Sequence, residues 1–274
     1  MDDSLNENVK ENGFLRYLFE ILLGVSLCAV IVLFVINSTL VNKHHFITKL
    51  DENNYYSELH NTIKEEMSKP VTDAGMYLTV LDEVTKVEEV KTEFDKVIEV
   101  LFNGGEVDIN TATVEDRIFN NIEKFLNETN IKVDPTSIDL LVSNLLDIYT
   151  ENLTFKGKLE EYSANLTKVN DILTIITIFS VGVLIGSGAY IIFVSKKSPI
   201  GTASITLGLV MFAGYFLVKS FGNIESITMY NETLSEMMRN MIYYVLDKVS
   251  IVGIVGLIIG IISAIFGGYN FLNK

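Results

Sequence analysis

Four long stretches of this chain contain no Asp, Glu, Lys or Arg, and they restrict its fold more than any other feature. They are residues 21–41, 172–195, 199–218 and 249–272. At about 1.5 Å per residue, a helix of about 20 residues crosses a bilayer core of about 30 Å. A soluble core rarely needs one such helix, and four are not expected. The sequence therefore predicts an all-α protein with four transmembrane helices solvated by membrane lipid.

The segment between the first two stretches, residues 42–171, carries nearly all of the net charge. It contains 26 Asp and Glu against 13 Lys and Arg, while the whole chain has a net charge of −14. Such an acidic surface repels phosphate backbones, so no nucleic-acid partner is expected. The single cysteine, Cys28, lies in the first apolar stretch, which excludes a disulfide within the chain. An outer domain without disulfides points to a bacterial or archaeal envelope.

Positive charges next to the apolar stretches predict the orientation of the chain. The turn of residues 196–198 between the second and third stretches holds Lys196 and Lys197, and Arg16 lies in the tail of residues 1–20. Short loops that carry Lys or Arg normally stay in the cytoplasm. We therefore expect a multi-pass cell-membrane protein with both termini in the cytoplasm.

In this orientation two segments lie outside the cytoplasm. Residues 42–171 are predicted to form an extracytoplasmic helical bundle domain inserted between spans one and two. Residues 219–248 have apolar side chains at helical spacing and are predicted to form an amphipathic helix. This helix would either lie on the bilayer surface or pack against the outer domain. Its polar face is not strongly basic, which favours the second arrangement.

Local signals divide the outer domain into helices. Apolar residues at three- and four-residue steps predict a helix over residues 51–69 that Pro70 either ends or interrupts. The segment Thr113–Asp116 has the form of a capping box. The pair at residues 134–135, Asp followed by Pro, is typical of a helix start. The last helix either continues without a break into the second span or is divided by a joint near residues 156–158.

Small residues recur at four-residue steps in two of the spans. This spacing lets helix backbones approach closely in lipid. We expect these residues to pack the helices of the bundle together, or else to join copies of the chain into a homo-oligomer. They are Gly182 and Gly186 in span two and Gly253, Gly256, Gly260, Ala264 and Gly268 in span four.

Residues that could carry chemistry are few. The three histidines, His44, His45 and His60, have no HExxH motif and no cysteine partner, so no metal site is predicted. Glu20 follows Arg16 by four residues, a spacing that favours an ion pair at the membrane interface over a buried functional carboxylate. The sequence has no phosphate-binding glycine loop and no nucleophile motif. We expect no enzymatic activity and no cofactor.

Three patterns in the outer domain carry a resemblance to known proteins. They are Tyr56, Leu59 and Ile63 after span one, the run Val84–Phe102 that ends in Asn-Gly-Gly, and Ile118–Phe125 leading to Asp134 and Pro135. With this order of spans, the chain resembles uncharacterised four-pass membrane proteins of low-GC Gram-positive bacteria that have an extracytoplasmic helical domain. The resemblance implies the same overall plan and carries no activity and no functional residues.

These expectations favour a non-enzymatic component of the cell envelope that binds, senses or acts as a scaffold through its outer domain. A membrane or surface protein would be its partner, because the cytoplasmic parts are too short to carry a signalling output. The alternative is a passive channel or lipid-handling protein assembled through its glycine-rich spans. The spans hold no ionisable residue at mid-depth, which argues against a pump.

Overall fold

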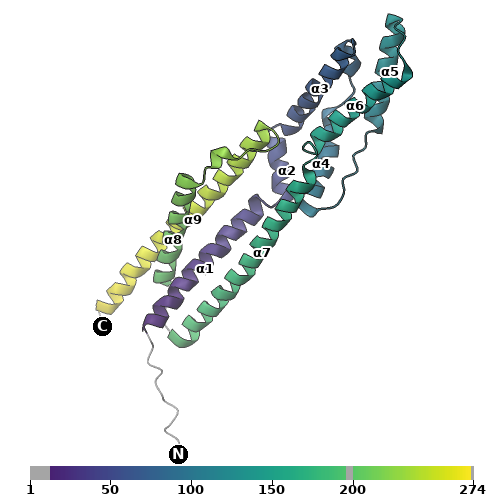
Figure 1. Cartoon of the computed structure of the whole chain (residues 1–274). Coiled ribbons are helices and arrows are strands. Elements are labelled where there is room, and N and C mark those ends of the chain that lie inside the picture. The colour runs from purple at the N-terminus through teal and green to yellow at the C-terminus, as the bar shows by residue number, and fades with distance from the viewer. Residues whose placement is uncertain (1–12, 196–199, 273–274) are drawn as a thin grey trace, which may run out of the picture. The chain divides into compact units, whose positions relative to one another are not determined.

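The computed structural model describes residues 13–195 and 200–272, and every regular element within these ranges is helical (Figure 1). The all-α fold class predicted from the sequence is therefore confirmed. In chain order the elements are α1 (Gly13–Thr39), α2 (Lys43–Glu52), α3 (Tyr55–Asp73), η1 (Leu78–Leu81), α4 (Val87–Asn103), α5 (Ala112–Thr129), α6 (Pro135–Leu153), α7 (Leu159–Tyr190), η2 (Ile191–Ser195), α8 (Ile200–Phe221), η3 (Ile224–Ser226) and α9 (Glu232–Leu272).

Four of the helical segments are long and apolar enough to cross a membrane. They are Gly13–Thr39, Leu159–Phe193, Ile200–Phe221 and Glu232–Phe266. Each overlaps one of the charge-free stretches, so the predicted number of candidate spanning helices is confirmed. Three of them begin well before their charge-free stretch, because a helix can extend beyond the apolar part of its sequence. The chain is thus consistent with a multi-pass helical membrane protein.

The chain divides into two compact units. Unit 1 comprises Met1–Leu40, Asp171–Ile227 and Arg239–Lys274, and unit 2 comprises Val41–Asn170 and Thr228–Met238. Residues Thr228–Met238, which comprise the end of the connection after α8 and the start of α9, thus group with the domain formed by the long segment after α1. The rest of residues 219–248 belongs to unit 1.

Unit 1 is held together by apolar side chains from α1, α8 and α9. Cys28 of α1, Leu207 and Met211 of α8, and Val245 and Val249 of α9 are buried in one cluster. Helices α1 and α8 lie side by side (Figure 1). Few apolar side chains of these helices belong to this core, and many large ones on their outward faces are exposed.

Unit 2 has an amphipathic helical core. Apolar side chains at helical spacing on α3, α4, α5 and α6 are buried, while polar residues occupy the opposite faces. Aromatic rings lie at its centre: the ring centroids of Tyr55 and Phe94 are 5.2 Å apart, and those of Phe94 and Phe155 are 5.5 Å apart. Other fully buried side chains are Leu50, Leu59, Ile63, Met67, Ile98, Ile118, Ile122 and Leu145.

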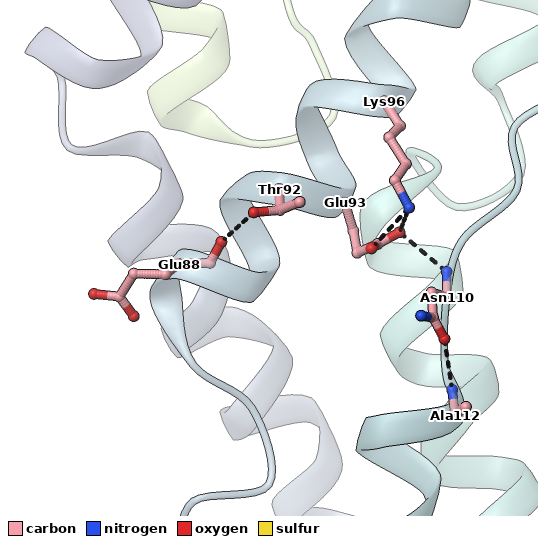
Figure 2. A network of polar contacts seen from close by, with 6 residues as sticks. All are labelled: Glu88, Thr92, Glu93, Lys96, Asn110 and Ala112. Carbon is pink, nitrogen blue, oxygen red and sulfur yellow. Dashed lines mark hydrogen bonds and ion pairs between the residues drawn. The ribbon is translucent and has the colours of Figure 1, made fainter.

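A buried carboxylate fixes the loop between α4 and α5. Figure 2 shows that Glu93 of α4 points toward Lys96 and toward the backbone of Asn110. Both Glu93 oxygens lie 2.9 Å from Lys96 Nζ, and the Asn110 N–H donates to Glu93 Oε2 at 3.0 Å. The Ala112 N–H donates to the Asn110 side chain at 3.2 Å, where α5 begins. Glu93 is only 8% exposed, so its charge is stabilised by these partners, and its role is structural.

The helix that Pro70 was predicted to end or interrupt continues through this residue to Asp73. Helix α3 runs through Pro70 and ends at Asp73, and the Ala74 N–H donates to the Pro70 carbonyl at 3.0 Å. A proline near the end of a helix removes one backbone hydrogen bond, and the residues after it can still close the last turn.

The predicted capping box at Thr113–Asp116 does not form. Helix α5 begins at Ala112 with Thr111 as its N-cap, so Thr113 already lies inside the first turn. The predicted cap of α6 is present, because Asp134 accepts a hydrogen bond from the Thr136 N–H at 3.3 Å.

Of the two alternatives for the last helix of the outer domain, the structure has the joint. Helix α6 ends at Leu153, and α7 begins at Leu159 after a turn that contains residues 156–158. From Leu159, α7 continues without a break to Tyr190 and so includes the second charge-free stretch from its start.

Residues 219–248 do not form the separate helix that the sequence predicted. Helix α8 ends at Phe221, the short helix η3 follows, and α9 begins at Glu232 and continues through the fourth apolar stretch. Asn223 adopts a left-handed conformation with φ of +40°, which breaks the helix after α8. Asn231 starts the next one, since its Oδ1 accepts a hydrogen bond from the Leu234 N–H at 2.9 Å.

Candidate ligand-binding cavity

A buried asparagine organises a polar network in unit 2. Asn152 of α6 is fully buried, and its Nδ2 donates to Glu66 Oε2 at 2.7 Å and to the Ile148 carbonyl at 2.8 Å. Its Oδ1 accepts a hydrogen bond from the Tyr230 hydroxyl. Lys156 Nζ lies 2.8 Å from the other Glu66 oxygen. The amide and both carboxylate oxygens are thus satisfied, as buried polar groups require.

Three consecutive left-handed residues form the turn that places Lys156. Phe155, Lys156 and Gly157 have φ of +56°, +53° and +76°. This conformation suits glycine but costs about 1 kcal/mol or more at each of the other two residues. Burial of the Phe155 ring offsets the cost, because its centroid lies 5.5 Å from that of Phe94 and 6.1 Å from that of Tyr230.

Burial and neighbouring charges shift two ionisable groups of the network. Burial raises the pKa of Glu66, but hydrogen bonds from Lys156 and Asn152 together outweigh it, so the pKa lies below its ordinary value. Burial, with the negative charges of Glu66 and Glu151, raises the pKa of Tyr230 to about 12. At neutral pH the carboxylate is therefore ionised and paired, and the phenol is a neutral donor.

A cavity of about 410 Å³ adjoins this network. Its volume lies in the range of small-molecule sites in proteins. The pair formed by Glu66 and Lys156 also borders a second cavity of about 530 Å³ beside α3. The first cavity is lined by Thr62, Glu66, Phe155, Lys156, Lys158, Tyr162, Met229, Tyr230 and Asn231.

Three separate parts of the chain wall the first cavity. Residues 62–66 belong to α3, residues 155–162 to the turn and the first residues of α7, and residues 229–231 lie directly before α9. Both α7 and α9 continue from here into candidate spanning helices. The cavity therefore lies at the start of two helices that the sequence predicts to enter the membrane.

Two polar atoms next to the cavity lack partners in the described part of the chain. Tyr55 is completely buried, and its hydroxyl lies beside the Asn231 side chain. Neither Tyr55 Oη nor Asn231 Nδ2 makes a hydrogen bond of normal geometry to the described residues. An unpaired buried polar group costs about 1–3 kcal/mol. Of the two residues, only Asn231 lines the cavity, so its amide is the one that a bound polar group could satisfy.

Three of the predicted packing glycines in α9 lie against α8. A β-carbon at Gly260 would approach Ile205 N to 2.7 Å, and one at Gly256 would approach Leu207 Cδ2 to 2.6 Å. Gly253 is confined in the same way. A side chain larger than hydrogen at these glycines would therefore push α9 and α8 apart. Such close contact between helix backbones is typical of glycine in membrane helices.

The remaining predicted packing residues have different surroundings. Gly182 and Gly186 on α7 have open space where a side chain would lie. Ala264 is exposed on α9. The surroundings of Gly268 fall outside the part of the chain that the structure describes. Gly253, Gly256 and Gly260 of α9 thus contact another helix of the same chain, whereas the face of α7 that carries Gly182 and Gly186 is open.

The residues predicted to set the orientation are only partly described. Lys196 and Lys197 lie outside the described residues. Arg16 Nε lies 2.8 Å from Glu20 Oε1, as the i, i+4 spacing predicted. The Glu20 side chain is 1% exposed and that of Arg16 is 19% exposed, so the carboxylate is the more buried partner.

Among the described residues, which include all three histidines, no group of three or more His, Cys, Asp or Glu side chains is placed to hold a metal ion. His60 Nε2 instead lies 3.0 Å from the Thr85 carbonyl, a contact that joins α3 to the start of the α4 segment.

No pattern in the sequence indicated the polar network around Asn152. Its members lie on segments separated by 86 and 78 residues, so periodicity within one helix does not reveal the pairing. One signal was available: Asn152 follows Leu145 and Tyr149 on the buried face of α6, where an asparagine needs hydrogen-bond partners.

Comparison with protein-family models, with curated proteins and with solved structures finds no match for this chain.

Proposed function

We propose that the protein is a non-enzymatic binding and sensing component of the cell membrane that acts through unit 2. The observation that supports it most is the position of the cavity at the first residues of α7 and α9. A ligand that contacts Tyr162 and Asn231 would favour one arrangement of both helix starts over others. A ligand shifts a conformational equilibrium through such differential contacts.

The proposed orientation places unit 2 outside the cytoplasm and both termini inside. Its support is the distribution of charge in the sequence: a lysine pair in the shortest connection, and an acidic domain between the first two spans. In this arrangement a membrane or surface protein would receive the signal.

Photo-crosslinking in native membranes tests this function. Tyr162→p-benzoylphenylalanine places the photoreactive group in the cavity, and Leu140→p-benzoylphenylalanine places it on an exposed site of α6 as a matched control. We expect irradiation to add a small-molecule mass to the peptide with residue 162 and not to the peptide with residue 140. Equal labelling at the two sites, or none at residue 162, would contradict the proposal.

The alternative, a passive channel or lipid-handling protein, has weaker support. It needs glycine faces that are free to meet another copy, and those of α9 contact α8 within the chain. Only Gly182 and Gly186 present a free glycine face among the predicted packing residues described here. Liposomes that contain the purified protein and show solute leakage or lipid transfer would favour this alternative.

A further inference from the structure

We infer that the first cavity of unit 2 binds a small organic anion, a carboxylate or phosphate ester that carries an aromatic or apolar group. This inference rests on the proposed function and names the chemical class of its ligand. Four observations carry it: the charge of the lining, the unpaired amide of Asn231, the start of α7 and the aromatic wall.

The lining of the cavity has a net positive charge in an otherwise acidic domain. Glu66 is its one carboxylate, and both of its oxygens are engaged by Lys156 and Asn152. Lys158 has no ion-pair partner among the described residues. A cationic ligand would therefore meet a carboxylate already in use and an uncompensated ammonium, whereas an anion would complete the charge balance.

A polar donor is available where an anionic headgroup would lie. The Oδ1 of Asn231 is held by the Leu234 N–H, so its Nδ2 group is directed away from the α9 backbone and remains unpaired. The buried Tyr55 hydroxyl lies beside this amide but does not line the cavity. A carboxylate or phosphate oxygen in the cavity can accept a hydrogen bond from the Asn231 amide, which removes the penalty of that orphaned group.

The first turn of α7 adds a favourable field. The helix begins at Leu159, directly after Lys158, and the N–H groups of a first turn have no partners within their own helix. Glu160 and Glu161 in this turn are exposed and do not line the cavity. The positive end of the helix and the lysine thus act on the same region.

The apolar part of such a ligand would contact an aromatic wall. The ring centroids of Phe155 and Tyr162 are 5.7 Å apart, and those of Phe155 and Tyr230 are 6.1 Å apart. Met229 completes this side of the lining. These three rings and the Met229 side chain can contact a flat or aliphatic group of a ligand without further hydrogen bonds.

The test uses the full chain in phosphatidylcholine nanodiscs and fluorine NMR of three probes. 4-Fluorobenzoate and 4-fluorophenyl phosphate represent the two kinds of anion, and 4-fluorobenzylamine is the matched cation. We expect line broadening and saturable binding of at least one anion, with the cation at least about tenfold weaker, as one charge-assisted contact predicts. The stronger of the two anions identifies the headgroup.

Variants locate the binding. Lys158→Met should lower the affinity for the anion about tenfold. Lys132→Met, which removes an exposed lysine outside the cavity, should leave this affinity unchanged. Asn231→Asp keeps the oxygen that caps α9 but replaces the amide donor by a carboxylate, so it should abolish anion binding. Circular dichroism of each variant checks that the helices remain intact.

Three results would overturn the inference: tighter binding of the amine than of both anions, no saturable binding of any anion, or anion binding unaffected by both Lys158→Met and Asn231→Asp. Each of these can occur while photo-crosslinking at residue 162 still captures a ligand. In that case the sensing function would stand, and only the class of ligand would be wrong.

Discussion

Large apolar side chains have opposite positions in the two units. In unit 2 the rings of Tyr55, Phe94 and Phe155 are buried at the centre of a bundle whose outer faces are charged. In unit 1 large side chains such as Phe179 and Phe216 point outward, and the helices meet through glycine and a narrow apolar cluster. A surface so apolar is not stable in water. Unit 2 is therefore stabilised by removing apolar surface from water, whereas the exposed apolar faces of unit 1 are consistent with helices that pack against one another in lipid.

The largest expected effect comes from filling the contact between α8 and α9. Gly260→Leu would place atoms against Ile205, where even a β-carbon approaches a backbone nitrogen to 2.7 Å, and should destabilise the protein by about 2–3 kcal/mol. Gly182→Leu is the matched control, because its site has open space, and should change stability little. Unfolding in mixed micelles with increasing SDS measures both. Equal losses would mean that glycine contact does not hold unit 1 together.

The buried network of unit 2 gives the next largest effect. Asn152→Ala leaves the Tyr230 hydroxyl and one Glu66 oxygen without their partner, so it should cost about 2 kcal/mol. Asn127→Ala, on an exposed site of α5, is the control and should cost almost nothing. Thermal unfolding followed by circular dichroism compares the two variants. A stable Asn152→Ala protein would show that the network does not contribute to folding.

The smallest effect is a dependence of stability on pH. The folded-state pKa of Glu66 lies below its ordinary value, so the ionised carboxylate stabilises the fold. This contribution is complete above the unfolded-state pKa of about 4.5 and is lost as the pH falls through the lower folded-state pKa. Because the pair is partly exposed, we expect Glu66→Gln to cost about 0.5 kcal/mol at pH 7 and progressively less as the pH falls through the folded-state pKa.

Glu65→Gln changes the neighbouring exposed carboxylate and is the control for this pH dependence. Urea titrations at several pH values provide the measurement. A difference between the two variants that grows as the pH is lowered would have the wrong sign and would exclude the ion pair with Lys156 as its cause.

The sequence predicted unit 1 better than it predicted the cavity. An uncharged stretch of about 20 residues has few structural alternatives, so the four apolar helices and the contacts of Gly256 and Gly260 follow from local pattern. Helix ends were less certain: Pro70 lies inside α3, and Thr113 lies inside the first turn of α5, because neighbouring backbone can close a turn without the expected signal.

The cavity could not be found from the sequence because tertiary contacts assemble it. Asn152, Glu66 and Tyr230 come from three helices or connections, and no periodicity links them. The left-handed conformations of Phe155 and Lys156 run against their local preference and persist because the ring of one and the charge of the other gain partners. In the sequence, only Gly157, which follows these two residues, indicated a turn.

Spin labels at two equally exposed apolar positions test directly whether lipid is the solvent of unit 1. In a Cys28→Ala background, Phe179→Cys on α7 and Leu140→Cys on α6 replace side chains that are 72% and 67% exposed. In nanodiscs, the label at residue 179 should collide with oxygen and not with a water-soluble nickel chelate, and the label at residue 140 should show the reverse. Free access of the nickel chelate to residue 179 would contradict the account.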